Sequence, residues 1–469
     1  MKQNPAVTVA FLTFAINPYF ELEESKRIEE ESLAMLRGFE GIDILPLPSL
    51  VFEEMAMGRR TFEEMEVTVQ ERLGAVANLL DRCQPDLLII QSGTFNLDRY
   101  ILSVVNDYRG PLVLWAYPEG VSRKGGLQIN SLAGAMSNNS ALRKIGKTPE
   151  FLFGLPSETK VYTFFNQKIR ALQSLKALRR STIGLIGVPF TGYFAATYDE
   201  MTIRRILGVE LVHFEIRDFL EEINALPREE VDRVTSSLYV QGSEKVRCFV
   251  SEQDLANSAK AYLALKRFLE KYNLDCISIK CQPELKNWFD LNPCFSISKL
   301  ADEGMIVGCE GDVGLLLSMY LEFLLSGKPG VLLEIVKVNE ERNIGVMWHC
   351  GQAPSMYADA QGEITLEKHT LAPGTTVIEF PFTPGRVTIA RFAQLEETLK
   401  LFVATGEIVP ARDYFKGAYA EILFDAGIRR VIETIFAHGV EHHQALVYGD
   451  LLDELLEVGK LLDVEVIVP

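Results

Sequence analysis

Short apolar runs alternate with helix-like segments along the first part of this chain, and this alternation constrains the fold most strongly. The runs at residues 7–12, 42–45, 86–90 and 111–115 have the composition of buried strands, and residues 21–37 and 61–80 carry helical spacing. Strands that alternate with helices form a mostly parallel sheet. The sequence therefore predicts a doubly wound, Rossmann-like αβ unit at the N-terminus.

Two loops of this first unit lie where such a sheet would bind a ligand. Residues 91–94 and 117–120 each follow a predicted strand. Ligands of open parallel sheets bind beyond the carboxyl ends of the strands. Both loops are candidates for a binding edge, with ordinary strand-to-helix turns as the alternative.

A second αβ unit is predicted after a helical connector at residues 159–180. Strands are expected at residues 181–188 and 276–280, and helices at 199–207 and 254–272. The unit also includes the run at 211–214. The glycine-bearing loop at 189–193 precedes a helix, a position that suits an anion. However, the chain contains neither GxGxxG nor GxxxxGK[ST], so the sequence does not favour nucleotide binding.

The last part of the chain changes to short β runs separated by glycine and proline. After a helix at 313–325, the predicted strands are 330–338, 344–348, 377–380, 386–392 and 398–403. Such spacing is typical of an antiparallel barrel or sandwich. Helices are expected at 426–436 and 451–462, and the final run at 464–468 is suited to rejoin a parallel sheet.

With 469 residues, the chain is too long for a single core. We expect three domains: an N-terminal αβ domain at 1–158, a central αβ domain at 159–325, and a β-barrel-like domain at 326–469 whose terminal helices return to the αβ core. Two domains are the alternative.

Charge and cysteine content restrict the partners. A net charge of −17 disfavours nucleic acid and anionic membranes, because both would repel the chain. No apolar run approaches the roughly 20 residues of a membrane span, and the N-terminus lacks the pattern of a signal peptide. The seven cysteines form no CxxC pair, which fits a reducing compartment. We therefore expect a cytoplasmic protein.

Histidines and carboxylates gather late in the chain in a pattern that suits a divalent cation. Five of the six histidines lie between residue 349 and the C-terminus, downstream of the tetrad Cys309-Glu310-Gly311-Asp312. Carboxylates at a strand end, joined by histidines from later segments, can bind a metal ion. The alternative for Glu310 and Asp312 is that they only cap the helix that follows. His442 and His443 are consecutive, so we expect only one of them to reach the metal.

These segments together resemble the L-fucose isomerase and L-arabinose isomerase superfamily. The tetrad and its apolar helix are followed in the family's order by residues 332–334, 348–351 and 441–444, and segments at 197–210 and 386–391 are similar too. The resemblance implies two αβ units and then a β-rich domain whose end supplies a metal-binding histidine. Residues 130–135, interpreted as a loop of small polar residues, resemble a segment near the sugar site, with a flexible connection as the alternative.

The two branches of this superfamily imply different ligands. His443 matches the histidine ligand of both branches, Glu334 a glutamate ligand of the arabinose enzymes, and Asp312 the aspartate ligand of the fucose enzymes. His349 lies where the arabinose enzymes carry a carboxylate, which is a departure. The expected metal ligands are Asp312, Glu334, His349 and His443, and the expected catalytic residues are Glu310, Asp312 and Glu334. His213, His369 and His438 are expected to be ordinary surface or barrel residues.

The resemblance also implies a reaction. Family members convert an open-chain aldose into a ketose through an ene-diol, with Mn²⁺ or a similar cation such as Co²⁺ or Mg²⁺, and are commonly trimers or hexamers. We therefore expect a metal-dependent, homo-oligomeric isomerase that acts on a neutral or anionic sugar. The alternatives are a non-catalytic sugar-binding or regulatory protein on the same fold and a metal-assisted carbohydrate lyase.

Overall fold

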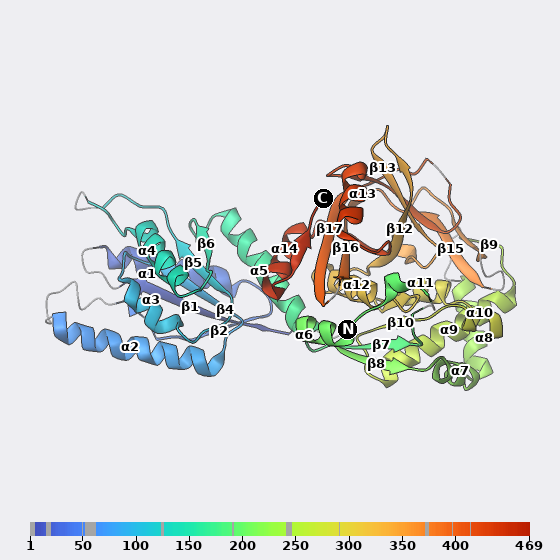
Figure 1. Ribbon diagram of the computed structural model, residues 1–469, viewed down its shortest axis with the longest axis horizontal. Helices are drawn as coiled ribbons and strands as arrows, with labels where there is room; N and C mark the ends of the chain where they lie inside the picture. Colours follow the sequence, from blue (N-terminus) through green and yellow to red (C-terminus); the bar gives the residue numbers. More distant parts are fainter. Residues whose placement is uncertain are drawn as a thin grey trace. The chain divides into compact units, whose positions relative to one another are not determined.

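The computed structural model divides into two compact units, Gln3–Lys176 and Ala177–Pro469 (Figure 1). It describes residues 5–469 except 16–19, 49, 52–61, 123–125, 190–191, 241–245, 290, 371–374, 396 and 413. The predicted loop at 189–193 thus lies partly outside the described residues. Within those residues, no helix combines the length and apolarity that crossing a membrane requires.

The first unit is a parallel sheet covered by helices. Its strands run in the order β2-β1-β4-β5-β6, with β3 paired to β1. All pairings are parallel. The elements are β1 (Val7–Ala15), α1 (Leu22–Arg37), β2 (Ile42–Leu45), β3 (Leu50–Val51), α2 (Phe62–Cys83), β4 (Leu87–Ser92), α3 (Asp98–Val105), β5 (Leu112–Ala116), α4 (Ser131–Lys144), β6 (Glu150–Phe153) and α5 (Thr159–Leu178).

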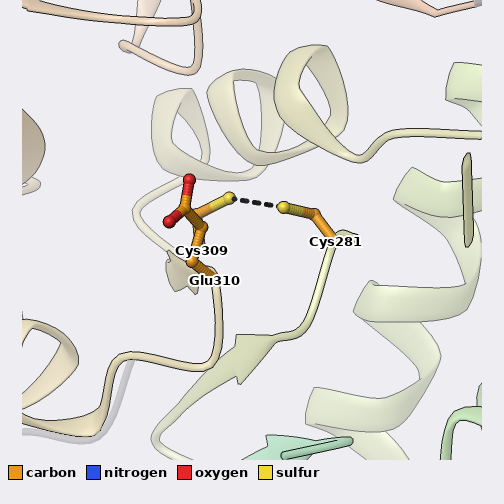
Figure 2. A group of neighbouring side chains, drawn as sticks. All are labelled: Cys281, Cys309 and Glu310. Atoms are coloured by element: carbon orange, nitrogen blue, oxygen red, sulfur yellow. Dashed lines mark hydrogen bonds between the residues drawn. The ribbon is translucent and has the colours of Figure 1, made fainter. Parts of the chain in front are cut away.

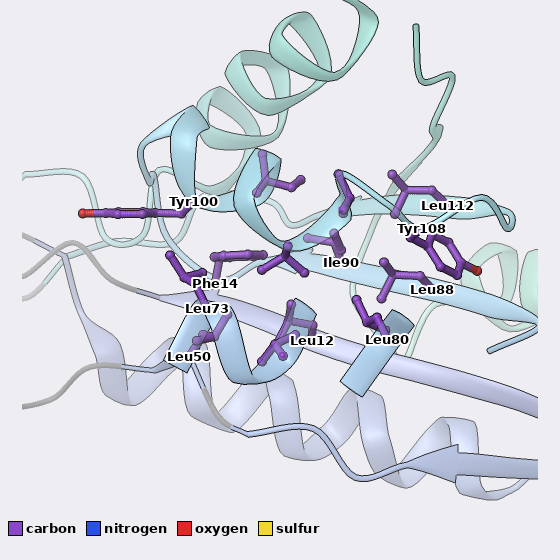
Figure 3. Packing of buried hydrophobic residues seen from close by; sticks show 14 of the residues in the cluster. Leu12, Phe14, Leu50, Leu73, Leu80, Leu88, Ile90, Tyr100, Tyr108 and Leu112 are labelled. Atoms are coloured by element: carbon purple, nitrogen blue, oxygen red, sulfur yellow. The ribbon is translucent and has the colours of Figure 1, made fainter. Parts of the chain in front are cut away.

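Apolar side chains of β1 and β4 pack against α2 and α3 to form the core of this unit (Figure 3). Leu12, Leu88 and Ile90 from the strands are buried together with Leu73 of α2 and Ile101 of α3. Burial of such side chains contributes about 1.5–3 kcal/mol each. The predicted alternation of buried strands and amphipathic helices is therefore present in the first unit.

The loop predicted at residues 130–135 is wrong, because α4 begins at Ser131. Asn130 has a left-handed φ of 56° and precedes the helix. Small residues occur here because the helix packs closely on the chain after β4. A Cβ at Gly134 would lie 3.0 Å from Cα of Phe95, and the Ser131 hydroxyl donates to the carbonyl of Ser92 at 2.5 Å. A tight packing requirement thus has the same sequence signature as a small-residue loop.

The second unit contains a four-stranded parallel sheet in the order β11-β10-β7-β8. Helices and short elements surround its strands. In chain order they are β7 (Thr182–Ile186), η2 (Phe194–Ala196), α6 (Glu200–Leu207), β8 (Glu210–Phe214), α7 (Ile216–Asn224), α8 (Arg228–Val240), β9 (Val246–Cys248), α9 (Glu252–Lys271), β10 (Cys276–Ile279), α10 (Glu284–Phe289), α11 (Cys294–Asp302), β11 (Ile306–Cys309) and α12 (Val313–Ser326).

A β-barrel completes the second unit. Pairing between β17 and β18 closes the path β17-β16-β19-β12-β13-β18 into an antiparallel barrel. The elements are β12 (Val331–Asn339), β13 (Ile344–His349), η3 (Ser355–Tyr357), β14 (Ile364–Lys368), β15 (Thr376–Pro381), β16 (Gly385–Leu395), β17 (Thr398–Val409), β18 (Ala418–Phe424), α13 (Ile428–His438), β19 (Gln444–Tyr448), α14 (Leu452–Leu462) and β20 (Glu465–Ile467). The C-terminal strand β20 pairs in parallel with β17 of the barrel sheet.

The mixed α/β class, with parallel sheets followed by a C-terminal β-barrel, is confirmed. The Rossmann-like description of the αβ parts and the three domain boundaries remain predictions. Strands β18 and β19 had no counterpart in the sequence analysis, although β19 directly follows the His442-His443 pair.

Candidate metal centre

Two strands of the central parallel sheet end beside each other, and one of them, β11 (Ile306–Cys309), leads into the acidic tetrad. β10 and β11 pair in register, and Glu310 follows the last residue of β11 directly. Glu310 has a left-handed φ of 63°, which is uncommon for a residue other than glycine and occurs often at functional sites. Gly311 follows with a φ of 71°. This turn places Glu310 at the carboxyl edge of the sheet, where open αβ sheets bind ligands.

The barrel contributes the remaining candidates, which lie on or directly beside three neighbouring strands. Glu334 on β12 pairs with Trp348 on β13. His349 is the residue after Trp348 and ends β13. Leu333 pairs with Gln444 in the antiparallel β12–β19 ladder, which brings Glu334 next to His443. The strand register therefore brings together residues that lie more than a hundred positions apart in the chain.

The nitrogen and oxygen atoms of these side chains form two groups that share His443. Nε2 of His349 and Nε2 of His443 each lie 3.8 Å from a carboxylate oxygen of Glu310. Ligand atoms of Glu310, His349 and His443 all lie within 4.8 Å of one another, as do those of Glu334, His442 and His443. Separations of 3.8 Å exceed hydrogen-bond length. Two atoms that each bind one ion at about 2 Å can lie at most about 4 Å apart, so these separations leave room for one ion between the atoms.

These residues also line a single cavity with a volume of about 340 Å³. Glu310, Glu334, His349, His442 and His443 all contribute to its wall. The lining further includes Tyr193, Lys280, Cys281, Gln282, Trp348 and Cys350. The cavity thus combines a potential cation site with polar groups that can bind hydroxyls.

Asp312 is fully engaged with other protein groups. Both of its oxygens accept from the Arg391 guanidinium, at 2.8 and 2.9 Å, and Oδ1 also accepts from the backbone N–H of Leu315 at 2.9 Å. Oδ2 lies 3.2 Å from Nδ1 of His443. Burial alone would raise the pKa of Asp312, but Arg391 and His443 outweigh this and lower it to about 2. Asp312 therefore caps α12, as the alternative interpretation held, and also contacts a candidate ligand.

The surroundings of His349 are rich in negative charge. Burial would lower the pKa of its imidazole, but Cys350, Glu310 and Glu334 outweigh this and raise it to about 9. The same groups that favour a charged imidazole would favour a metal cation in the cavity. Gln352 lies 3.1 Å from Nδ1 and holds the ring, which leaves Nε2 facing Glu310.

His442 and His443 lie side by side and do not point to opposite faces. Their ring centroids are 4.2 Å apart, because both residues precede β19 and do not belong to a strand. His443 is buried, whereas the His442 side chain is 44% exposed. Burial, followed by repulsion from His443, lowers the pKa of His442 to about 4.

Tyr193 and Arg391 are two residues of this region that the sequence analysis did not assign. The Tyr193 hydroxyl contacts Nε2 of His442 and lies 3.3 Å from Nε2 of His443. Burial and the nearby carboxylates raise the pKa of Tyr193, so its hydroxyl keeps its proton. The side chains of both residues reach the site across long sequence separations, and their local sequence carries no metal-site signal.

The remaining histidines lie elsewhere. His213 pairs with Glu200 at 3.0 Å, and His438 with Glu465 at 3.7 Å, both at exposed positions. His369 is buried at the end of β14, where it contacts Cys350. Within the described residues, none of these three belongs to a group that could hold an ion.

Comparison with known proteins adds a direct indication of activity. No family model matches the chain. A sulfoquinovose isomerase from Alkalicoccus urumqiensis is 30% identical over 387 residues, covering 82% of this chain and 86% of the relative. The chain belongs to the sulfoquinovose isomerase family. Sulfoquinovose isomerases from Priestia megaterium (27% over 407 residues, 86% and 90% covered) and Clostridium sp. (26% over 462 residues, 97% and 98% covered) are also similar.

Membership in this family confirms the predicted enzyme class. The chain is a sugar isomerase that interconverts an aldose and a ketose, which is an intramolecular oxidoreductase. The non-catalytic and lyase alternatives have no support among these relatives. Placement in the L-fucose and L-arabinose isomerase superfamily remains a prediction.

Proposed function

We propose that this protein is a metal-dependent isomerase that converts sulfoquinovose into its ketose through an ene-diol. The names of its relatives support the substrate. The donor set in the cavity supports the metal, because two carboxylates and two imidazoles suit Mn²⁺ or a similar divalent cation such as Co²⁺ or Mg²⁺. The observation that carries the proposal is the approach of His349 and His443 to the same carboxylate, that of Glu310.

The proposed ligands are Glu310, Glu334, His349 and His443. This set replaces Asp312 of the predicted ligands with Glu310, because both Asp312 oxygens already accept from Arg391. Asp312 instead holds His443 through Nδ1, a role that outer carboxylates commonly have around metal-bound histidines. His349 and His443 would bind through Nε2.

The reaction moves one proton from C2 to C1 of the open-chain sugar and one from O2 to O1. When bound, a divalent cation would stabilise the negative charge that develops on O1 and O2. Glu310 and Glu334 both lie near His443, so one carboxylate can take the C2 proton and return it to C1 while the other carries the hydroxyl proton. The protonated Tyr193 can donate a hydrogen bond to a sugar oxygen in the same cavity.

Lys280 is the proposed partner of the substrate's sulfonate. Among the described residues that line the cavity, it is the single lysine or arginine. Its side chain is buried, and Nζ lies 2.8 Å from Oε1 of Glu284. Lys280 also lines the neighbouring cavity, which contains His213 and Arg217. If C1 and C2 of the hexose lie at Glu310 and Glu334, the sulfonate end of the sugar would extend along the part of the cavity that Lys280 lines.

We also propose that the enzyme is a cytoplasmic homo-oligomer, either a trimer or a hexamer. An apolar cavity of about 740 Å³ lies beside His442 and includes Ile335 and Val336. Its rim carries Phe194 and Phe436, whose exposed fractions are 81% and 82%. Exposed aromatic residues around an apolar hollow are typical of protein interfaces. Sedimentation velocity would test the assembly.

A direct substrate comparison tests the proposed function. The purified protein is incubated with Mn²⁺ and either sulfoquinovose or unsubstituted glucose, and ketose formation is followed by NMR in deuterated water. We expect ketose from sulfoquinovose, with exchange of the transferred proton, and a much lower rate from glucose. Equal rates on both sugars would contradict the sulfonate assignment, and no ketose from either would contradict the proposed reaction.

A further inference from the structure

Two buried thiols meet beside the proposed metal centre. Cys281 lies just beyond β10, and Cys309 ends the neighbouring strand β11. Their Sγ atoms are 3.6 Å apart, with the Cys309 thiol donating to Cys281, and the side chains point toward each other (Figure 2). Glu310 follows Cys309, and one oxygen of its carboxylate lies within 4.8 Å of both sulfur atoms.

The separation of the sulfur atoms fits a tetrahedral metal ion. Two thiolates that bind one ion at about 2.3 Å lie about 3.8 Å apart. A carboxylate oxygen on the same ion would lie about 3.5 Å from each sulfur. The Glu310 oxygen lies within 4.8 Å of both sulfur atoms before any ion binds. Because thiolates prefer soft or borderline ions, these three side chains suit Zn²⁺ or Cd²⁺ better than Mn²⁺ or Mg²⁺.

An ion can reach the thiols through the substrate cavity. Cys281 and Glu310 both line the cavity of about 340 Å³, while Cys309 is buried and contacts Cys281 through its sulfur. Binding would release one proton from each thiol, so that an ion of charge +2 meets two thiolates and one carboxylate. A solvent molecule in the cavity can supply the fourth ligand.

Glu310 belongs to both groups of ligands. Its carboxylate lies 3.8 Å from Nε2 of His349 and of His443, and it also completes the group with Cys281 and Cys309. If the Glu310 carboxylate turns toward an ion bound by the two sulfur atoms, the metal site at His349 and His443 loses one oxygen ligand. The two sites therefore compete for one side chain.

We propose that Cys281, Cys309 and Glu310 form a second cation site for thiophilic ions such as Zn²⁺ and Cd²⁺, whose occupation weakens binding at the histidine site. The binding itself is independent of the proposed function, whereas inhibition of the isomerase rests on it. The site would make the enzyme sensitive to an excess of thiophilic metal.

Cadmium binding tests the site without any substrate. One equivalent of Cd²⁺ is added to the metal-free full-length protein, and the ultraviolet thiolate-to-cadmium charge-transfer band is recorded. We expect a band that is lost in Cys281→Ser, Cys281→Ala and Cys309→Ala. Cadmium affinity in these variants should fall by more than about 100-fold, because changes outside the ligand shell alone cost about 10–100-fold. Cys83→Ser and Cys248→Ser are matched controls, because these cysteines lie outside every candidate ligand group of the described residues.

Melting temperatures of the metal-free variants establish that each is folded. Absence of the band in the wild-type protein, or a full band in both folded Cys281 variants, would overturn the site.

Competition between the two sites is measured from the concentration of free Mn²⁺ by electron paramagnetic resonance. Cd²⁺ should weaken Mn²⁺ binding at least tenfold in wild type but not in Cys309→Ala. A cadmium band without weaker Mn²⁺ binding would overturn the proposal that the thiol site weakens the histidine site. None of these measurements uses a sugar, so they stay separate from a failure of the proposed reaction.

Discussion

Nδ1 of His443 lies 3.2 Å from Oδ2 of Asp312, and both side chains are buried. This contact leaves Nε2 of His443 directed at Glu310, 3.8 Å away. The Arg391 guanidinium donates to both oxygens of this carboxylate, at 2.8 and 2.9 Å. The chain Arg391–Asp312–His443 therefore fixes an imidazole ring at the edge of the cavity before any ion binds.

Asp312 and Glu334 should respond differently to substitution. Asp312→Asn keeps a cap for α12 but weakens the hold on His443, so we expect Mn²⁺ affinity to fall by about 10–100-fold. Glu334→Gln removes a proposed ligand, and we expect a larger loss of both affinity and turnover. Calorimetric titration with Mn²⁺ measures both. Loss of all binding in Asp312→Asn with normal binding in Glu334→Gln would show that Asp312 is the ligand.

Replacement of His443 with Ala should abolish activity and bound metal, because an imidazole ligand is lost. His438→Ala is the matched control, since His438 pairs with Glu465 at an exposed position. His442→Ala is expected to keep the metal, because His442 is half exposed and contacts Tyr193. Metal content after dialysis, measured by mass spectrometry, checks all three. Full metal content in His443→Ala would refute the assignment.

Lys280→Met should raise the KM for sulfoquinovose by about 10–100-fold, since a hydrogen bond to a charged group contributes about 1.5–3 kcal/mol. The rate on unsubstituted glucose should change little, because that sugar has no sulfonate. Lys400→Met is a matched control, as Lys400 also pairs with a glutamate at 2.8 Å but lies on the barrel surface. An equal rise in KM for both sugars would show that Lys280 has only a structural role.

Acid should remove the stabilisation that Asp312 provides. Its folded pKa of about 2 lies below the ordinary value of 3.8, so the charged form stabilises the fold above about pH 4. This stabilisation, about 2 kcal/mol by linkage, is lost as the pH falls from about 4 to 2. The melting-temperature difference between wild type and Asp312→Asn should therefore be constant near neutral pH and shrink below pH 4. A constant difference down to pH 2 would contradict the depressed pKa.

The sequence predicted most of the elements that carry the site, because apolar periodicity is a local property. The strand ending at Cys309, the helix after Asp312 and the strand ending near His349 all lie where expected. The strand after His443 was missed, since residues 444–448 form only a short apolar run.

The roles of single side chains depended on contacts that no local pattern contains. Arg391 is 79 residues from Asp312 in the chain. Their ion pair shows that the Asp312 carboxylate is already bound by a protein group, and no local pattern contains this contact. The meeting of Cys281 with Cys309 follows from the register of two parallel strands, which the sequence does not specify. Glu310, expected to transfer protons, faces both His349 and His443 because of the left-handed turn that follows β11.

The central claim is that a metal held by Glu310, Glu334, His349 and His443 is needed for isomerisation. Metal-stripped protein should be inactive on sulfoquinovose, and ketose formation should return in proportion to added Mn²⁺ until one ion is bound per chain. Full activity of the stripped protein in the presence of a chelator, with no bound metal by mass spectrometry, would contradict the account.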